Sequence, residues 1–441
     1  MAPLQIHHFC TYPHGGAAKA ALRLHGALQT QGSASFFHYT LADRPAPEGR
    51  GIEQLEFAPS KRIPVWSAFG DRLRRNHTRE IYRLYREHLE RRPPHLETFS
   101  MAQQAEPTRL PPLFSSQAIA HLHWIAYLAD YPTFFGTIPT AVPIVWTMHD
   151  MNPITGGCHF SGGCDRFVVG CGNCPQVINP RPDDVSRVSY SVKQRALRHR
   201  QIHVVSPSRW LLRLAQQSPI WPNDTAFSLV RYGIDTNVFH PIDCRVARQQ
   251  LGLDQSPVII GFAADQLLNP RKGADFLWQA LGMRDATPPV QLLVFGAGEL
   301  PNSIEGVARV HHLGYMDNPQ QQALAYSACD FVVMPSLEDN LPQVGIEALA
   351  CATPVVGFDS GGLAELVLDG IHGLLAPAGD AAALSRALQW MIAHPDETAV
   401  MGQRGRLAMV REFDSAVQAR KYLSIYSDEL SQAQRRQRRS A

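Results

Sequence analysis

Residues 331–350 read FVVMPSLEDNLPQVGIEALA, a short apolar run followed by an acidic loop and then by a helical pattern. The apolar run Phe331–Met334 predicts a buried strand. A helix is expected to begin near Pro342, because proline tolerates the first turn, where its missing N–H would have no partner. A strand that leads through a polar loop into a helix is typical of α/β proteins with parallel sheets.

The same alternation extends through the rest of the second half of the chain. Further strands are expected at Val258–Ala263, Gln291–Phe295 and Pro354–Phe358. Helices are expected at Ala274–Leu281, Pro319–Ala328, Gly345–Ala350, Gly362–Asp369, Ala381–Ala393 and, last, Lys421–Leu430. The spacing of apolar residues therefore predicts one α/β domain in this half.

The first half repeats this pattern. Strands are expected at Leu4–Phe9, Ala118–Trp124, Ile144–Met148 and His203–Val205, and a helix at Ala17–Thr30. A basic and aromatic stretch at residues 61–100 interrupts the alternation and is interpreted as an insertion. With 441 residues, the chain has room for two to three domains.

We expect a first domain at residues 1–240, which carries the insertion 61–100 and a cysteine-rich segment at 156–175. A second domain is expected at 241–408, and a final helix with a basic tail at 409–441. Two doubly wound domains that face each other would place a ligand cleft between them, at the carboxyl ends of both sheets.

Composition describes an ordinary globular protein, with 45% hydrophobic and 18% charged residues. A net charge of +2 indicates no particular partner, and no nucleic-acid partner is expected. Arginines cluster between Arg72 and Arg92 and again between Arg435 and Arg439; such clusters form either solvated helix faces or contacts with anionic lipid. No secretory signal and no long apolar run is found, which predicts a cytoplasmic protein, with Arg72–Arg92 as a candidate contact with the inner face of the membrane.

The acidic loop and a basic triplet suggest the chemistry. Asp339 precedes a helix start, where N–H groups attract anions. A carboxylate there would repel phosphate, so sugar hydroxyls are its better target, and Glu347 in the following helix could reach a ribose. Arg271 and Lys272 stand before Gly273 at another helix start and could neutralise the charge that develops on a leaving diphosphate.

These residues resemble the acidic E-x7-E motif of the family 4 retaining glycosyltransferases, with Asp339 and Glu347 at its ends. In that family the first acid contacts the donor sugar and the second the nucleotide ribose. This chain departs from the motif by having Asp339 first, with Glu338 beside it. Either acid could act, and the spacing to Glu347 favours Asp339. In the family an arginine stands near the end of the first strand of the second domain, which is expected here at Val258–Ala263. This chain has Ala263 or Ala264 at that place, and Arg271 is expected to compensate.

The resemblance implies a GT-B architecture, with two facing Rossmann-like domains, an inter-domain cleft and a carboxyl-terminal helix. It also implies net retention at the anomeric carbon without a catalytic metal, since cationic side chains and helix ends handle the diphosphate. The acceptor would be a saccharide or lipid-linked saccharide in the biosynthesis of a surface polysaccharide or exopolysaccharide. Donor-binding residues implied by the motifs are Gly15, Gly16, Gly296, Gly298, Leu313, Gly314, Asn340 and Leu341.

Histidines gather in the first half. His149 ends a predicted strand, and in the family a histidine here lies close to the reacting sugar. It could hydrogen-bond a sugar hydroxyl without acting as a base, or it could be a structural histidine at a strand end. His121 and His123 alternate as in a strand, so both face one side and could line an acceptor site.

A separate cluster of cysteines lies between residues 156 and 175, at Cys158, Cys164, Cys171 and Cys174. The last two have the spacing of ligand pairs in structural zinc sites, and four thiolates would complete a closed tetrahedral site. His159 could replace one ligand. Free thiols, a disulfide or an iron–sulfur arrangement are the alternatives. The segment resembles an insertion in a bacterial polysaccharide-synthesis branch of the family.

Two other functions fit the same resemblance. The chain could be a partner subunit that binds a nucleotide sugar without turnover, or a nucleotide-sugar epimerase on the same fold. A dinucleotide dehydrogenase is disfavoured, because no Gly-x-Gly-x-x-Gly follows the first predicted strand.

Overall fold

The computed structural model describes residues 4–42, 45–57, 79–93, 96–283, 288–298 and 309–440. Contacts divide the chain into two compact units, with Met1–Val230 and Ala419–Ala441 in unit 1 and Arg231–Gln418 in unit 2. The boundary between the units follows Val230, whereas the sequence predicted a first domain that ends at residue 240. The carboxyl-terminal segment Ala419–Ala441 belongs to unit 1. The arginines between residues 72 and 75 lie outside the described residues.

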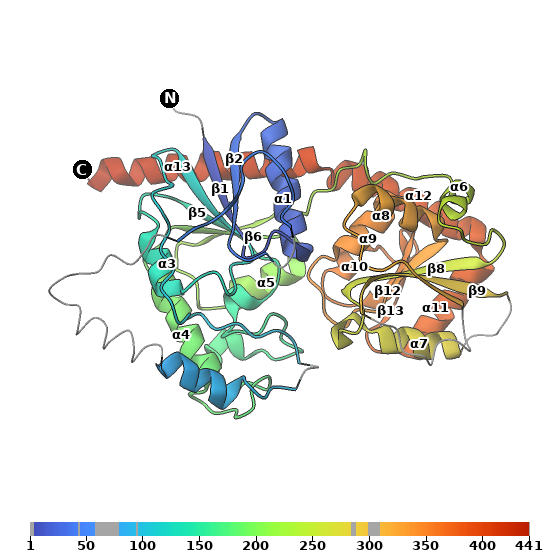
Figure 1. The fold of residues 1–441 in the computed structure, drawn as a ribbon, viewed down its shortest axis with the longest axis horizontal. Coiled ribbons are helices and arrows are strands. Elements are labelled where there is room, and N and C mark those ends of the chain that lie inside the picture. Colours follow the sequence, from blue (N-terminus) through green and yellow to red (C-terminus); the bar gives the residue numbers. More distant parts are fainter. Residues whose placement is uncertain are drawn as a thin grey trace. The chain divides into compact units, whose positions relative to one another are not determined.

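Unit 1 is built on a seven-stranded sheet with the order β3-β2-β1-β4-β5-β6-β7 (Figure 1). All neighbouring strands in it are parallel. The strands are β1 (Gln5–Phe9), β2 (Ala34–Tyr39), β3 (Ile52–Gln54), β4 (Ala118–Leu122), β5 (Ile144–Thr147), β6 (Ile202–Ser206) and β7 (Ala226–Leu229). The expected strands of this half are confirmed, with small shifts at their ends.

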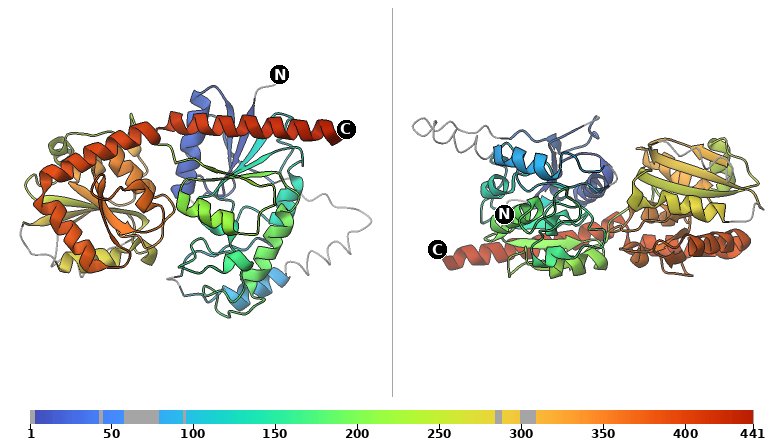
Figure 2. Two further views of the ribbon diagram at one scale, coloured as in Figure 1. Left: turned by 180° about the vertical axis from the view of Figure 1, so that it is seen from behind. Right: turned by 90° about the horizontal axis from the view of Figure 1, so that it is seen from below.

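Helices cover both faces of this sheet. They are α1 (Gly15–Thr30), α3 (Tyr131–Thr137), α4 (Val185–Leu197), α5 (Arg209–Gln217) and α13 (Ser415–Ser440), which belongs to unit 1 from Ala419 onward. Two single turns, η1 (Asn152–Ile154) and η2 (Arg166–Val169), lie in the loop after β5. Leu24 of α1 and Tyr422 of α13 share one buried cluster with Val145 of β5, so these two helices cover the same face (Figure 2).

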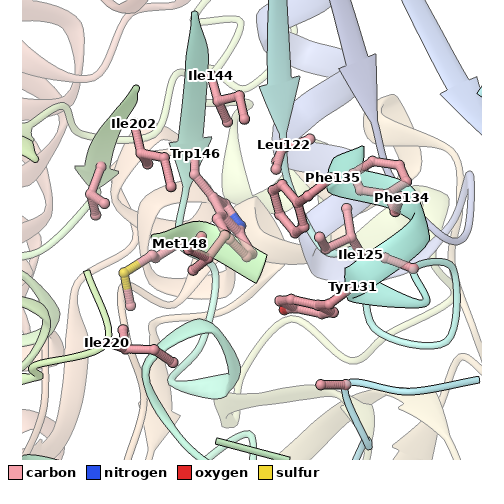
Figure 3. Packing of buried hydrophobic residues seen from close by; sticks show 14 of the residues in the cluster. Leu122, Ile125, Tyr131, Phe134, Phe135, Ile144, Trp146, Met148, Ile202 and Ile220 are labelled. Atoms are coloured by element: carbon pink, nitrogen blue, oxygen red, sulfur yellow. The ribbon is translucent and has the colours of Figure 1, made fainter. Parts of the chain in front are cut away.

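The opposite face carries the larger core of unit 1. Trp146 of β5 is fully buried there among aromatic residues of α3, including Tyr131 and Phe135 (Figure 3). Trp146 and Val145 point to opposite faces, because successive side chains in a strand alternate. Burial of such an aromatic side chain stabilises the fold by roughly 2–3 kcal/mol.

Unit 2 is built on a six-stranded parallel sheet with the order β10-β9-β8-β11-β12-β13. Its strands are β8 (Val258–Gln266), β9 (Val290–Ala297), β10 (Arg309–His312), β11 (Phe331–Met334), β12 (Val355–Asp359) and β13 (Gly373–Pro377). Its helical segments are α6 (Cys244–Gln250), η3 (Pro270–Lys272), α7 (Ala274–Gly282), α8 (Pro319–Ala328), α9 (Gln343–Ala350), α10 (Leu363–Leu366), α11 (Ala381–Ala393) and α12 (Pro395–Glu412). Leu277 of α7 and Leu388 of α11 pack on one face of the sheet.

Both sheets have the strand order of a doubly wound α/β fold, which confirms the expected class. The order reverses between β1 and β4 in unit 1 and between β8 and β11 in unit 2. In such sheets, ligands bind beyond the carboxyl ends of the strands at this reversal. The loops that follow β8 and β11 therefore form the edge of unit 2 at which a ligand is expected to bind.

Among the described residues, no helix combines the length and the apolar character needed to cross a membrane.

Candidate functional site

Two loops of unit 2 are locked together at the strand-order reversal. The Asn269 side chain accepts a hydrogen bond from Arg271 N at 2.9 Å and so starts the short turn η3. Gly273 follows with a φ of 72°, and a Cβ there would lie 1.9 Å from Pro335 O, so only glycine lets the two loops approach this closely. Leu337 N donates to Arg271 O at 2.8 Å, which holds the basic triplet against the acidic loop.

This contact brings the two predicted cations to the predicted acid. Lys272 Nζ donates to Asp339 Oδ2 at 2.6 Å, and Arg271 Nη1 lies 3.5 Å from Asp339 Oδ1. Arg271 Nη1 also donates to Glu338 O at 2.7 Å. Glu338 thus contributes its main chain to this cluster, while Asp339 contributes its carboxylate.

Asp339 is 8% exposed, yet it stays ionised. Burial by itself would raise the pKa of its carboxyl, but the charges of Lys272 and Arg271 and the hydrogen bond from Lys272 outweigh burial and lower this pKa. The Asp339 carbonyl also accepts a hydrogen bond from Gly362 N at 2.9 Å, from the turn after β12. Asp339 is therefore held both by its carboxylate and by its main-chain carbonyl.

Helix α9 follows directly. Its N-cap is Pro342, whose side chain makes no capping hydrogen bond. Because α9 begins directly after the acidic loop, the positive end of the helix dipole lies close in sequence to Asp339. Glu347 lies in the second turn and is 4% exposed. Tyr326 of α8 donates from its hydroxyl to Glu347 Oε2 at 2.9 Å, which orients this buried carboxylate.

The predicted glycine turns lie at the same edge of the sheet. Gly296 lies in the last two residues of β9 and Gly298 directly follows the strand, with φ values of 150° and 110°. Gly296 N donates to Gly314 O at 3.0 Å, and Leu313 N donates to Val294 O at 2.8 Å, so the turns after β9 and β10 are joined. Asn340 and Leu341 are buried between Asp339 and α9.

Together these loops form one site. Two cations, one ionised acid and a helix amino terminus lie beyond the carboxyl ends of neighbouring strands, in the place where this fold binds nucleotides. Such a set can hold an anionic diphosphate through the cations and the helix end, and a polyhydroxyl group through the acid.

In unit 1, Gly15 and Gly16 open α1 after β1, and His14 at the N-cap makes no side-chain capping bond. His149 follows β5 and is half-buried. Its Nε2 lies 3.0 Å from Nδ1 of the buried His123. Burial lowers the pKa of His149 to about 4, although the neighbouring Asp150 works in the opposite direction, so the ring is neutral at neutral pH.

The four cysteines line one small cavity of about 20 Å³, with Phe99, Gly156 and Ser186. Gly156 N donates to Cys171 Sγ at 3.2 Å. In the described part of the chain, the only trio of histidine, cysteine or acidic residues whose ligand atoms lie within 4.8 Å of one another is His8, His121 and His123. The thiols thus share a cavity without the close spacing of a bound metal site.

A buried cation lies beside this cavity. Lys193 is 1% exposed and donates to the carbonyls of Asn152 and Thr155 at 2.5 and 3.1 Å. Burial lowers the pKa of Lys193 to about 8, and the nearby Cys158, Cys171 and Asp150 oppose this effect. His159, proposed as an alternative ligand, instead hydrogen-bonds Asp150 at 2.6 Å and Ser100 at 2.7 Å.

Sequence reasoning did not single out several of these supporting residues. Asn269 precedes proline and is a recognisable turn signal, so it could have been found. Tyr326 and Lys193 lie in helices far from their partners in sequence, and no local pattern links Tyr326 to Glu347.

Comparison with solved structures identifies the fold. The chain resembles the sucrose-phosphate synthase of Thermosynechococcus elongatus with a TM-score of 0.66 and 20% identity, over 97% of this chain and 99% of that one. It resembles HepE of Anabaena, solved in complex with UDP, with a TM-score of 0.62 and 16% identity, over 96% of this chain and 100% of that one. The protein therefore has the GT-B fold of glycosyltransferases.

The match to a family model lies within unit 2. Residues 257–394, which contain Lys272, Asp339 and Glu347, match the family described as "Glycosyl transferases group 1". The chain thus contains a glycosyl transferases group 1 domain.

Several relatives of this chain are named D-inositol 3-phosphate glycosyltransferase. A D-inositol 3-phosphate glycosyltransferase of Segniliparus rotundus is 36% identical over 184 residues, which is 39% of this chain and 40% of that protein. Another, of Mycolicibacterium paratuberculosis, is 26% identical over 306 residues, or 67% of this chain and 63% of that protein. The matched regions thus span less than two thirds of these relatives.

Proposed function

We propose that this protein is a retaining glycosyltransferase that moves a sugar from a nucleotide diphosphate sugar to a saccharide or lipid-linked saccharide. The observation that carries the proposal is the Lys272–Asp339 pair at the strand-order reversal of a group 1 domain. The Anabaena protein HepE, which has a similar fold, was solved with UDP and with UDP-glucose, and this supports a uridine nucleotide sugar as a first donor to test.

In the proposed reaction, the bond between the anomeric carbon and the β-phosphate oxygen breaks, and its electron pair leaves with the diphosphate. The acceptor oxygen bonds to the anomeric carbon on the same face, and its proton passes to the departing phosphate oxygen. Arg271, Lys272 and the amino end of α9 offset the charge that grows on the diphosphate. Asp339 orients the donor sugar and Glu347 the ribose.

Unit 1 is proposed to supply the acceptor side. His149 accepts or donates a hydrogen bond at a sugar hydroxyl. Its low pKa keeps the ring neutral, and a neutral imidazole suits this role better than a positively charged one. The loop at Gly15 and Gly16 holds the transfer geometry. The pathway proposed for the product is the biosynthesis of a surface polysaccharide.

A structural zinc ion is proposed for the cysteine cavity. Four thiols and a buried lysine in one region fit a site where thiolate charge is partly offset by a cation. Binding would draw the four sulfur atoms together within the cavity that they already line. The metal would hold the loop after β5 in shape and would take no part in transfer.

Contact with a membrane is proposed through the basic segment between Arg72 and Arg92. In the described part of this segment, Arg83 already pairs with Glu80 and Glu87 at 2.7 Å each. The exposed Arg79, Arg86 and Arg91 are the remaining candidates there. Binding to vesicles should require anionic lipid and weaken with salt, and salt-independent binding would contradict it.

The experiment that tests the proposal is a thermal-shift screen of UDP-, GDP- and ADP-sugars, followed by product analysis with the best donor. A glycosyltransferase releases nucleoside diphosphate and makes a product with the anomeric configuration of the donor. A shift in melting temperature without release would indicate a binding subunit, and a changed sugar without an acceptor would indicate an epimerase.

A further inference from the structure

Unit 1 contains a continuous hydrogen-bonded line of four histidines and one serine, of which the proposed reaction uses only His149. It runs from the loop after β5 across the sheet to α1 and consists of His149, His123, His8, Ser35 and His25. The four residues after His149 are each at most 3% exposed. Removing polar groups from water is costly unless they are hydrogen-bonded, so these buried rings are expected to have hydrogen-bond partners.

Each link in the line is a hydrogen bond of ordinary length. His149 Nε2 lies 3.0 Å from His123 Nδ1, and His123 Nε2 lies 2.9 Å from His8 Nδ1. His8 Nε2 lies 3.1 Å from Ser35 Oγ, which lies 2.8 Å from His25 Nδ1. The line ends where His25 Nε2 meets the main-chain carbonyl of Arg50 at 3.0 Å.

The carbonyl of Arg50 fixes the direction of every link. A carbonyl oxygen only accepts, so His25 must carry its proton on Nε2, and its Nδ1 must accept. Ser35 then donates to His25, and its oxygen accepts from His8 Nε2. Gln29 also donates to the same carbonyl at 2.7 Å, which the second lone pair of the oxygen allows.

The same reasoning continues to the other end of the line. His8 carries its proton on Nε2, so its Nδ1 accepts from His123 Nε2, and His123 Nδ1 accepts from His149 Nε2. This assignment requires neutral rings. Burial lowers the pKa of all four histidines, those of His8 and His123 well below the ordinary value, so each ring carries one proton.

We infer that His123, His8, Ser35 and His25 are positioning residues that hold His149 in the Nε2–H tautomer, with Nδ1 as its hydrogen-bond acceptor. In this tautomer Nδ1 of His149 can only accept a hydrogen bond, which suits a donating hydroxyl and disfavours an acceptor group. For its consequence in catalysis this inference rests on the proposed function, but the tautomer itself does not.

A metal ion is the competing explanation for part of the line, because ring nitrogens of His8, His121 and His123 lie within 4.8 Å of one another. All six of these nitrogens already have hydrogen-bond partners. His121, the member outside the line, meets Thr147 at 2.8 Å and Tyr426 at 2.7 Å. A metal would have to displace several of these bonds, so the hydrogen-bonded line is favoured.

Long-range ¹H–¹⁵N NMR of the full-length protein labelled with ¹⁵N-histidine tests the inference, because the two nitrogens of a neutral ring differ according to which one carries the proton. Replacing each histidine singly with glutamine assigns its signals. The expected result is the pure Nε2–H form for His149, His123, His8 and His25. An Nδ1–H form of His149 in the unaltered protein would overturn the inference.

Variants at Ser35 test whether the tautomer is transmitted. Ser35→Ala removes the relay hydroxyl and should give His149 a mixture of both forms, whereas Ser35→Thr keeps the hydroxyl and should preserve the single form. His7→Gln is the matched control, since His7 is also buried in β1 but points to the opposite face and pairs with His38. A His149 that stays purely Nε2–H in Ser35→Ala would overturn the transmission through Ser35.

Addition of Zn²⁺ tests the alternative that these histidines bind a metal ion. Zinc is added beyond the one equivalent proposed for the cysteine cavity. Loss of the ring N–H signals of His8 and His123 would then identify a metal site and overturn the line, whereas unchanged signals support it. If the tautomers are as expected but no sugar donor is turned over, the line stands and the proposed function fails. If transfer occurs with a different His149 tautomer, the reverse holds.

Discussion

Lys272 Nζ lies 2.6 Å from Asp339 Oδ2, although the two residues are far apart in sequence and come from different loops. The pair joins a cation suited to phosphate with an acid suited to a sugar hydroxyl. In the proposed reaction a bound donor contacts both partners, and the ion pair positions each of them in advance.

Asp339, and not Glu338, should be the acid that matters for transfer. Asp339→Asn removes the charge that Lys272 and Arg271 surround, and turnover should fall about a hundredfold or more. Glu338→Gln is the matched control, because Glu338 meets Arg271 through its main-chain carbonyl, which the change leaves intact. Steady-state rates with the best donor measure both. An equal loss in the two variants would contradict the assignment.

Stability of unit 2 should depend on pH through the same carboxyl. The pKa of Asp339 is lowered from its ordinary value of 3.8, so its stabilising effect is fully present above that value and is lost as pH falls through the folded-state pKa. Urea unfolding of Asp339→Asn should therefore show a deficit of about 2 kcal/mol at neutral pH. This deficit should shrink in strong acid, and a deficit independent of pH would contradict the ion pair.

The cysteine cavity should bind one zinc ion per chain. Metal analysis of protein purified without chelator or nickel resin measures it, and Cys171→Ser together with Cys174→Ser should abolish binding. Cys10→Ser is the control, since this buried thiol is not among the residues that line the cavity. Absence of stoichiometric zinc in the unaltered protein would refute the site.

The aromatic core of unit 1 should be sensitive to truncation. Trp146→Ala removes a fully buried side chain and should cost about 3–5 kcal/mol of unfolding free energy. Val169→Ala changes a side chain of the same unit that is 63% exposed, and it should have little effect. Denaturant unfolding followed by tryptophan fluorescence compares the two, and similar losses would contradict the packing described.

Much of the fold could be predicted because buried parallel strands are short apolar runs. Phe331–Met334 was expected with the bounds that the structure has. Strand β2 was missed, since its ASFFHY sequence places a histidine within the run. Helix α12 was missed because glycines interrupt its pattern; a Cβ on Gly402 would lie 2.0 Å from Ala352 O, so tertiary packing explains what local propensity could not.

Other differences have similar causes. Helix α10 ends at Leu366, three residues before the expected Asp369, because Val367 takes an extended conformation. Helix α13 runs from Ser415 to Ser440, well beyond the expected Lys421–Leu430. Its Glu429 binds His203 of β6 at 2.9 Å, and a contact so distant in sequence leaves no local signal.

The candidate site was partly predictable for the same reason. Lys272 and Asp339 could be named from motifs, whereas the loop contact through Gly273 and Pro335 required the fold. The line of histidines was visible only as isolated residues, because its members come from four strands or their ends and one helix.

Release of nucleoside diphosphate from the best donor, compared between the unaltered protein and Lys272→Ala, tests the central claim most directly. Lys421→Ala is the control, since Lys421 is an exposed lysine of α13. The account predicts that Lys272→Ala lowers the rate about a hundredfold to a thousandfold while Lys421→Ala leaves it unchanged. Near-normal release by Lys272→Ala, or no release by the unaltered protein with any donor, would contradict it.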